Sequence, residues 1–535
     1  MKRFLSIALM TLAAMTFMSC SHDSTPKADH VIFVGIDCFG ASTLQRAETP
    51  NINRLIDNGA IQLYSRCVRE TSSSQNWMSI LSGASIEMHG VTGNAWDYET
   101  RVIEPAVKNN KGMFPTIFDH IKDQRPDAKV YAFYNWKSQD RMYDTSRFDK
   151  TQSWGGEEND AEVMDTAIEA YVADQPEFMY VYLGKVDHIG HTFGNESDTL
   201  MTCMKEADAM VGKLVNTLEE KGMMKNTVII LTGDHGGFHY GHGGDTKSEL
   251  EVPIIVYGEG VTKGKYISSV GMNFDVTATI AGLMGIELPS ECRGRFLKEA
   301  WEPKDEQCYV PMPMIRPFGG MVKNGETVTL TCDWPDVEVY YTLDGTEPTK
   351  DSQHYTEPFA LPESTTVKAV AYRNGQYSEV ASCFLYAGAM DGASCINYRL
   401  FRNYKGEVLP DFGKIGAPDA TGTISVFTLD ELPIAANEDD VAVLMTSNIV
   451  IPEDGIYRFA LTSDDGARLL IDGKEVVDNN GSHSAETKYG TIELTKGNHP
   501  IVIEYFEDCE AQLLELMFCK NGEDLRPVTV KDLAL

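Results

Sequence analysis

The sequence is poor in positive charge for its size. It has 535 residues, with 46 lysines and arginines against 79 aspartates and glutamates, which gives a formal net charge of −33 at pH 7. A protein that follows a nucleic-acid duplex needs a basic surface, so we expect no duplex binding. An anionic substrate must instead be bound by local groups.

Long hydrophobic runs are also absent after the beginning of the chain. Lys2 and Arg3 precede an apolar run over residues 4–18, which is shorter than the roughly 20 residues of a membrane-spanning helix. A short apolar run behind basic residues is typical of a signal peptide, which we expect over residues 1–20.

The end of that segment resembles the lipidation motif of bacterial lipoproteins. Residues 17–20 read FMSC, and the resemblance implies that Cys20 carries a lipid anchor. Ordinary cleavage near Ser19 is the alternative. We therefore expect an exported lipoprotein, periplasmic or on the cell surface, with residues 21–29 as a polar tether to the membrane.

Closely spaced cysteines, tandem repeats and low-complexity tracts are absent too. The eleven cysteines include no CxxC pair, which argues against a structural zinc knuckle. An exported protein can nevertheless form disulfides. Cys332 and Cys383 lie in the same small expected domain and are the pair we consider.

The composition, 42% hydrophobic and 23% charged, is that of a globular protein, and the length suggests three or four domains. Strand-like runs alternate with helical patterns over residues 30–305, which predicts an α/β domain whose mostly parallel sheet is flanked by helices. Short strands and turn signals follow. We expect two all-β sandwich modules, at residues 306–387 and 388–535.

The first of these modules has two turn signals between alternating strands, at Asp344-Gly345 and at Asn374-Gly375. Its run YYTLDGTEPT resembles the chitobiase C-terminal-type module of secreted glycan-active enzymes. The resemblance covers nearly all of residues 306–387, and it implies no catalytic role for this module.

The second module resembles the lectin-like module of the protective-antigen type, through the runs IPEDGIYRFALTSDDGARLLIDGKEVVDN and GTIELTKGNHPIVIEYFED. Some members hold Ca²⁺ through paired aspartates, and through the ion a sugar. The resemblance thus implies calcium at Asp464 and Asp465 and a glycan ligand, and carboxylate oxygens suit that ion. A plain hairpin-turn role for the two aspartates is the alternative.

Metal-ligating residues follow three of the strand-like runs in the α/β domain. Carboxyl ends of parallel strands are where ligands bind in such sheets, and the mixed oxygen and nitrogen donors suit Zn²⁺, in sufficient number for two ions. Each aspartate alone would more often be a loop or capping residue. The residues are Asp37, Asp187, His191, Asp234, His235 and His242.

A serine cluster precedes a helix-forming stretch near residue 76. Ser72, Ser73 and Ser74 place hydroxyl groups beside helical N–H donors, which stabilise negative charge. Each serine is a candidate nucleophile, and an ordinary serine-rich helix cap is the alternative.

Taken in order, these motifs resemble the alkaline phosphatase superfamily, and most closely its nucleotide pyrophosphatase/phosphodiesterase branch, over residues 30–300. The resemblance implies one zinc ion held by Asp187, His191 and His242, and a second held by Asp37, Asp234 and His235.

The same resemblance implies a nucleophile that bridges the two ions. Aligning Asn76 with the helix start of the branch gives Ser73 this role, with Ser72 and Ser74 one residue away. Asn94 would hold a phosphoryl oxygen, or else be a simple turn residue. The expected reaction is attack of Ser73 on phosphorus, with a covalent phosphoryl-serine intermediate and zinc lowering the hydroxyl pKa.

Substrate preference depends on residues 136–141. Lys137 and Arg141 could clamp a phosphomonoester, whereas Trp136 could form the wall that a diester requires. We expect a phosphodiesterase or nucleotide pyrophosphatase acting on a phosphoester or nucleotide-type substrate. The alternatives are a phosphomonoesterase and a glycan-binding surface protein with a decayed catalytic domain. A sulfatase is disfavoured because its C/S-x-P-S-R run is missing.

Overall fold

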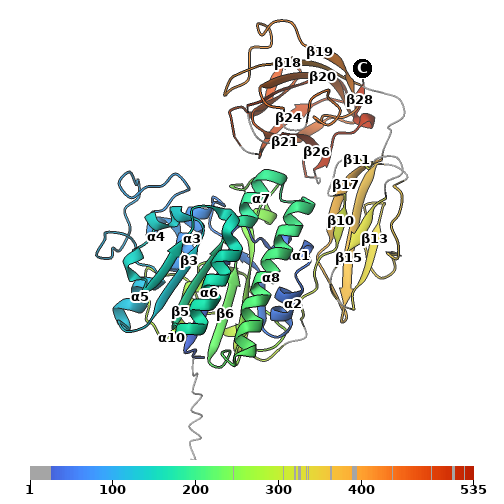
Figure 1. Ribbon diagram of the computed structural model, residues 1–535. Coiled ribbons are helices and arrows are strands. Elements are labelled where there is room, and N and C mark those ends of the chain that lie inside the picture. The colour runs from blue at the N-terminus through green and yellow to red at the C-terminus, as the bar shows by residue number, and fades with distance from the viewer. Residues whose placement is uncertain are drawn as a thin grey trace, which may run out of the picture.

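The computed structural model describes residues 26–534, with gaps at residues 245, 305–306, 318–320, 323–326, 333, 335, 362–363, 388–394, 436–437, 484, 509–511 and 523–524. The expected signal peptide and Cys20 lie outside the described residues. The described chain folds into three bodies in sequence order (Figure 1). Within it, no helix combines the length and hydrophobicity that a membrane crossing requires.

A nine-stranded sheet forms the centre of the first body, in the order β4-β3-β5-β1-β6-β7-β2-β8 with β9 beside β2. β1 pairs in parallel with β5 and β6, and only β7 runs antiparallel to its neighbours β6 and β2. The strands are β1 (His30–Ile36), β2 (Ala60–Arg66), β3 (Val130–Tyr134), β4 (Lys150–Ser153), β5 (Phe178–Leu183), β6 (Thr227–Thr232), β7 (Glu251–Gly258), β8 (Lys265–Tyr266) and β9 (Gly271–Met272). The predicted α/β fold with a mostly parallel sheet is confirmed.

Helices cover both faces of this sheet (Figure 1). Side chains of α1, α2, α6 and α8 pack on one face, and those of α3, α5 and α10 on the other. The helices are α1 (Ala41–Arg46), α2 (Pro50–Asp57), α3 (Ser73–Ser82), α4 (Ile86–His89), α5 (Ile117–Gln124), α6 (Asp160–Asp174), α7 (Lys185–Phe193), α8 (Asp198–Glu220), α9 (Lys247–Leu250) and α10 (Asp275–Met284).

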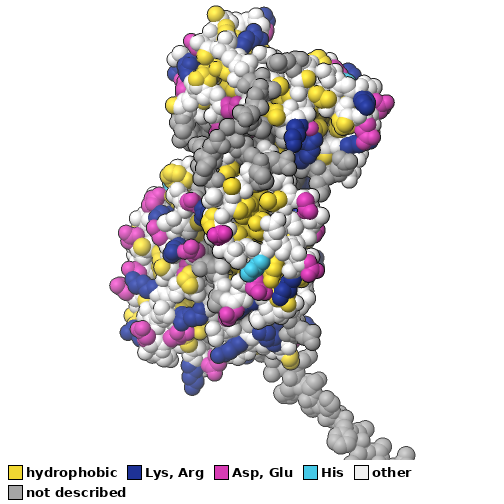
Figure 2. Space-filling model, turned by 90° about the vertical axis from the view of Figure 1, so that its right-hand side faces the viewer, with side chains coloured by type: hydrophobic (Ala, Val, Ile, Leu, Met, Phe, Trp, Pro, Cys, Tyr) yellow, Lys and Arg dark blue, Asp and Glu magenta, His cyan; other side chains and the backbone are white. Residues whose placement is uncertain are grey.

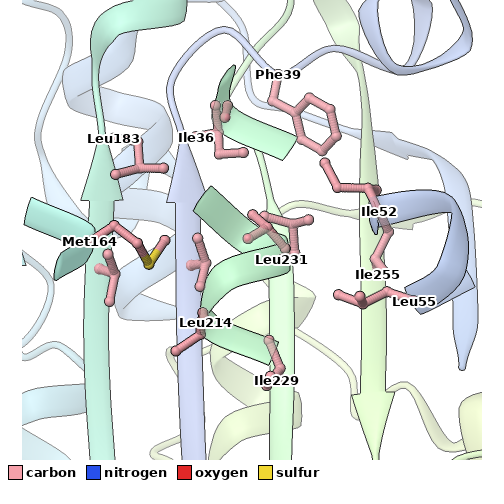
Figure 3. Close-up of a cluster of buried hydrophobic side chains, with 14 of the residues drawn as sticks. Ile36, Phe39, Ile52, Leu55, Met164, Leu183, Leu214, Ile229, Leu231 and Ile255 are labelled. Carbon is pink, nitrogen blue, oxygen red and sulfur yellow. The ribbon is translucent and has the colours of Figure 1, made fainter. Parts of the chain in front are cut away.

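Strand β1 lies between the two cores and supplies both. Ile32, Val34 and Ile36 join the first core, part of which is drawn in Figure 3. Val31 and Phe33 alternate with them and join the second core. Full burial on both faces is what a central parallel strand requires, and it explains the continuous apolar run in the sequence.

The second body is a small β-structure with its own core. The expected hairpin is present, since Arg373 pairs with Gln376 across Asn374 and Gly375, which both have positive φ. Its strands are β10 (Met314–Arg316), β11 (Met321–Val322), β12 (Thr329–Thr331), β13 (Glu338–Thr342), β14 (Gln353–His354), β15 (Thr365–Arg373), β16 (Gln376–Tyr377) and β17 (Ala381–Ala387).

The considered disulfide between Cys332 and Cys383 is wrong. Neither residue is in a disulfide. The Cys332 thiol contacts the Pro311 carbonyl at 3.7 Å, whereas the Cys383 thiol contacts the Pro317 carbonyl at 3.9 Å. The two sulfur atoms therefore have different partners inside one small core.

The third body consists of a seven-stranded and a four-stranded sheet that share one hydrophobic core. The predicted all-β character of the C-terminal part is thus confirmed. Its strands are β18 (Ile396–Arg402), β19 (Ala420–Ile424), β20 (Val441–Ile451), β21 (Gly455–Asp464), β22 (Ala467–Ile471), β23 (Lys474–Asn479), β24 (Glu486–Leu494), β25 (Gly497–Glu507), β26 (Leu513–Lys520), β27 (Arg526–Pro527) and β28 (Leu533–Ala534).

The bodies contact one another. Trp334 of the second body joins the hydrophobic core that includes α2 and α8, and Arg316 forms an ion pair with Asp198. The third body lies above α7 in Figure 1, where Glu515 lies 3.2 Å from the His239 ring of the first body. On the face shown in Figure 2, acidic and basic side chains are intermixed and hydrophobic ones gather near the middle.

Gly35 allows the helix α3 to approach the sheet. A Cβ atom at position 35 would lie 2.4 Å from Cη2 of Trp77, a side chain that is fully buried. We expect Gly35→Ala to lower the free energy of unfolding by about 1–3 kcal/mol, the usual cost of overpacking a core. Chemical denaturation of both proteins measures the difference.

Gly155→Ala is the matched control for this substitution. A Cβ atom there meets no atom within 4 Å, so its stability should stay within about 0.5 kcal/mol of the parent, as for an ordinary surface change. An unchanged unfolding midpoint for Gly35→Ala would contradict the packing argument.

Candidate active site

The first group of candidate ligands comes from two neighbouring strands. Asp37 follows β1, and Asp234 and His235 follow β6, so parallel pairing brings them to one edge of the sheet. His235 Nε2 lies 3.5 Å from Asp37 Oδ1 and 3.2 Å from Asp234 Oδ2. All three side chains are buried.

The second group is formed by Asp187, His191 and His242. His191 Nε2 and His242 Nε2 each lie 3.5 Å from an oxygen of Asp187. We expected Asp187 at the end of a strand, and this expectation is wrong. Strand β5 ends at Leu183, and Asp187 lies in helix α7. The four-residue spacing of Asp187 and His191 places both side chains on one face of that helix.

The two groups lie side by side. The rings of His235 and His242 have centroids 3.9 Å apart, and Ser73 Oγ lies 3.2 Å from His235 Nε2. The structure thus brings all six predicted ligands and Ser73 into one place, although they come from stretches far apart in the sequence.

The three imidazoles share one hydrogen-bonding pattern. In each, Nδ1 faces a backbone carbonyl and Nε2 faces the carboxylates. Burial lowers the pKa of His235 to about 4 and of His242 to about 3, so both rings are neutral at pH 7. The Nδ1 contacts are His235 with Gly236 O at 3.0 Å, His242 with Thr71 O at 2.8 Å, and His191 with Tyr240 O at 2.9 Å. A carbonyl only accepts, so Nδ1 carries a proton in each ring, and Nε2 of the neutral His235 and His242 rings presents a lone pair.

The aspartates lie close to one another. Burial and the charge of Asp187 raise the pKa of Asp37 to about 7, and burial and the charge of Asp37 raise that of Asp234 well above its usual value. Asp37 Oδ1 and Asp234 Oδ2 accept no hydrogen bond from any residue that the structure describes. Oxygen and imidazole lone pairs that face one another in a buried space are the donor set that divalent metal ions require.

Two aromatic residues that the sequence analysis missed hold Asp37. Trp77 Nε1 donates to Asp37 Oδ2 at 3.1 Å, and the Tyr182 hydroxyl donates to the same oxygen. Tyr180 and Tyr182 alternate on one face of β5, and this pattern near a strand end was the available signal. The Trp77 contact links the site to α3.

The serine cluster begins α3. Ser73 is its first helical residue and is nearly fully buried. The neighbouring Ser74 has other partners: its N–H donates to Asn94 Oδ1 at 2.9 Å, and its hydroxyl accepts from Arg141 Nη2 at 2.8 Å. Of these two serines, Ser73 is the one whose hydroxyl faces the candidate ligands.

Arg141, Asn94 and Trp136 lie beside this helix start. Arg141 also donates to the Asn94 carbonyl at 2.7 Å, and Trp136 stacks on Tyr182 with ring centroids 6.2 Å apart. Lys137 is exposed at the start of the 3₁₀ helix Lys137–Arg141, in a hollow that Trp136 also lines. The structure therefore places Arg141, Asn94 and Trp136 near the candidate ligands and Lys137 in the adjoining hollow.

Asn195 is a further supporting residue that sequence reasoning missed. It is buried, and its Nδ2 donates to the carbonyls of His239 at 2.9 Å and Gly241 at 3.2 Å. These bonds fix the loop that carries His242. An isolated asparagine behind a helix has no periodic signal, which is why the sequence could not identify it.

The two aspartates of the third body converge with Glu507, a residue not anticipated from the sequence. Asp464, Asp465 and Glu507 are at most 4% exposed. Burial and the charge of Asp465 raise the pKa of Asp464 to about 7, and burial raises that of Glu507 to about 10. The group lies inside the module rather than on its surface.

Comparisons with known proteins agree with this architecture. Residues 31–245 match the family described as type I phosphodiesterase / nucleotide pyrophosphatase. Residues 317–382 match the chitobiase/beta-hexosaminidase C-terminal domain, and residues 409–527 match the PA14 domain.

Individual relatives are distant. GPI ethanolamine phosphate transferase 2 of Aspergillus fumigatus is 30% identical over 141 residues, 24% of this chain and 18% of that protein. Ectonucleotide pyrophosphatase/phosphodiesterase family member 7 of Mus musculus is 23% identical over 248 residues, 43% and 55% of the two chains. The chain spans less than two thirds of either relative.

A solved structure, that of murine ectonucleotide pyrophosphatase / phosphodiesterase 5, is similar with a TM-score of 0.42 and 16% identity, over 49% of this chain and 96% of that one. The family resemblance predicted from the sequence is confirmed by the three matching families. The first body thus matches the type I phosphodiesterase / nucleotide pyrophosphatase family, and matches to a chitobiase C-terminal domain and a PA14 domain follow in that order.

Proposed function

We propose that the protein is a phosphoric ester hydrolase of the phosphodiesterase or nucleotide pyrophosphatase type that uses two zinc ions. The observation that carries this proposal is the orientation of the three histidines, whose Nδ1 atoms are bound by carbonyls while Nε2 faces carboxylates at 3.2–3.5 Å. Asp187, His191 and His242 would hold one ion, and Asp37, Asp234 and His235 the other. Ser73 Oγ lies 3.2 Å from His235 Nε2 of the second group.

Bound zinc supplies positive charge that lowers the pKa of a nearby hydroxyl and neutralises the phosphoryl oxygens. The chain supplies the rest of the reaction. Ser73 attacks phosphorus, the alcohol leaves, and a covalent phosphoryl-serine forms that water then hydrolyses. Asn94 uses Oδ1 to accept from Ser74 N–H, which leaves its Nδ2 group as a donor to a phosphoryl oxygen.

A phosphomonoesterase is the second candidate, and Arg141 favours it. Its guanidinium lies at the start of α3, bonded to Ser74 and Asn94, where it could bind the extra charge of a monoester. Trp136 on the adjoining side favours a diester, because a second substituent needs a wall to contact. The intact ligand groups argue against a decayed catalytic domain.

We propose further that the enzyme is exported and anchored to a membrane through Cys20, which the leader sequence supports.

For the PA14 domain we propose a calcium ion at Asp464 and Asp465, with Glu507 as an additional ligand. Because these side chains are nearly fully buried, such an ion would be structural and not in contact with a sugar. A glycan ligand would then bind elsewhere on the domain.

Ser73→Ala should lower the turnover of bis(p-nitrophenyl) phosphate and of p-nitrophenyl phosphate by about 10³-fold or more, because the attacking oxygen is lost. The ratio of the two parent rates also decides between diester and monoester. Ser72→Ala is the control: its side chain makes no capping hydrogen bond, so activity should fall less than about 10-fold. Equal losses in both variants would contradict the assignment.

Elemental analysis of the purified protein should find close to two zinc ions per chain. Treatment with a chelator should abolish hydrolysis and lower the unfolding temperature, because the bound ions stabilise the folded state and their removal leaves buried carboxylates facing one another. Added zinc should restore both properties. His242→Ala should reduce the zinc content, and full activity after complete removal of metal would exclude the proposal.

Calcium binding is tested separately by titration calorimetry on the zinc-loaded protein. One site is expected, and Asp464→Asn should weaken it by at least about 10-fold, since a ligand charge is removed. Asp454→Asn, in the same module but outside the cluster, should bind as the parent does. Absence of calcium binding in the parent would leave the three carboxyl groups with a purely structural role.

A further inference from the structure

A hollow of about 560 Å³ opens beside the candidate active site, and Trp136 is the one residue of its lining to which the proposed function gives a role. Its walls are residues 135–138 after β3, residues 155–158 after β4, and His188 of α7. Two of these walls touch the site. Trp136 stacks on Tyr182, which donates to Asp37, and His188 is the neighbour of Asp187.

The hollow adjoins the side on which a diester carries its retained substituent. In an in-line displacement the attacking and leaving oxygens are axial, so the retained substituent is equatorial, together with the oxygens that Asn94 and Arg141 would bind. The Arg141 guanidinium carbon lies 5.9 Å from the centroid of the Trp136 ring. A substituent that passes Arg141 therefore reaches the face of Trp136.

The charges around the hollow disfavour an ionic substituent. Glu157 and Glu158 would repel an additional phosphate group, as in a nucleoside polyphosphate. A cationic group would meet Arg141 beside Trp136 and the exposed Lys137. The two glutamates already face His188, with N···O distances of 3.7 and 3.4 Å. These charges therefore favour a neutral substituent in the hollow.

The lining also selects among neutral groups. It offers one aromatic ring, Trp136, and a rim of hydrogen-bonding side chains from Ser138, Glu157, Glu158 and His188. A hexose has an apolar C–H face for the ring and several hydroxyl donors for the carboxylates. A nucleobase has fewer hydrogen-bond donors for the carboxylates, and this lining has no second aromatic side chain to stack on its other face. We therefore expect the hollow to bind a nucleobase less well than a hexose.

We infer that this hollow binds a neutral sugar carried by the phosphoryl group, so that sugar phosphodiesters are the substrate class of the enzyme. The inference rests on the proposed function and extends it from the reaction to the substrate. It assigns Trp136 as the platform for the sugar ring and Glu158 as an acceptor for its hydroxyls.

The test compares p-nitrophenyl phosphodiesters that share a leaving group and differ in the retained substituent. The zinc-loaded full chain is assayed with the diesters of glucose 6-phosphate, thymidine 5′-phosphate and phosphocholine, together with bis(p-nitrophenyl) phosphate. We expect kcat/KM for the glucose diester to exceed the thymidine and choline values by about 10-fold or more, because hydroxyl partners in a built site discriminate strongly.

Substitutions in the hollow should remove this preference. Glu158→Gln and Trp136→Leu should each lower the ratio of glucose to thymidine kcat/KM by about 5-fold or more, since each removes one contact to the sugar. Glu158 is a largely exposed side chain, 62% accessible, so its replacement does not threaten folding. Glu162→Gln, on the exposed side of α6, is the control and should leave the ratio unchanged.

The outcomes separate the two proposals. Hydrolysis of bis(p-nitrophenyl) phosphate with a thymidine or choline preference, or a glucose preference that survives both substitutions, overturns the sugar assignment and leaves the proposed function standing. No hydrolysis of any ester by the zinc-loaded protein overturns the proposed function and the sugar assignment with it.

Discussion

The structure of the first body depends on three carboxylates held within reach of three imidazoles, and two of these carboxylates, Asp37 and Asp234, are buried. Asp37 and Asp234 lie where burial and the charges of neighbouring carboxylates oppose their own charge, as the raised pKa values of both groups indicate. Such an arrangement is costly in an apolar core unless cations compensate it. The surrounding protein therefore has to hold the ligands in place, and much of the nearby structure does so through backbone groups.

The support reaches from the ligands into the core by short, direct contacts. Trp77 packs against Gly35 in the middle of β1 and donates to Asp37 at the end of the same strand. Because Trp77 also belongs to α3, which begins with Ser73, one side chain fixes the distance between the candidate nucleophile and a candidate ligand. A substitution at Gly35 that displaces Trp77 would therefore also shift Asp37 and Ser73 relative to each other.

The sequence predicted what depends on local pattern and on strand order. The runs before Asp37 and Asp234 are continuous and apolar, so their strands and the residues at their ends could be placed without coordinates. The run before Asp187 was harder, because a strand ends at Leu183 and a helix begins at Lys185 within the same apolar stretch. Hydrophobicity does not distinguish the two states over so few residues, and the ligand was expected on the wrong element for that reason.

Contacts between distant segments could not be predicted in this way. Asn195, Thr71 and Tyr182 support the ligands through hydrogen bonds whose partners are separated by more than forty positions, and no periodicity announces them. The same holds for Glu515, which lies 3.2 Å from His239 in the loop between His235 and His242. Asn195 holds that loop from inside the first body while a residue of the PA14 domain meets it from outside. The C-terminal domain therefore borders the candidate active site, a relation that domain matching along the chain cannot show, because it orders the domains in sequence and not in space.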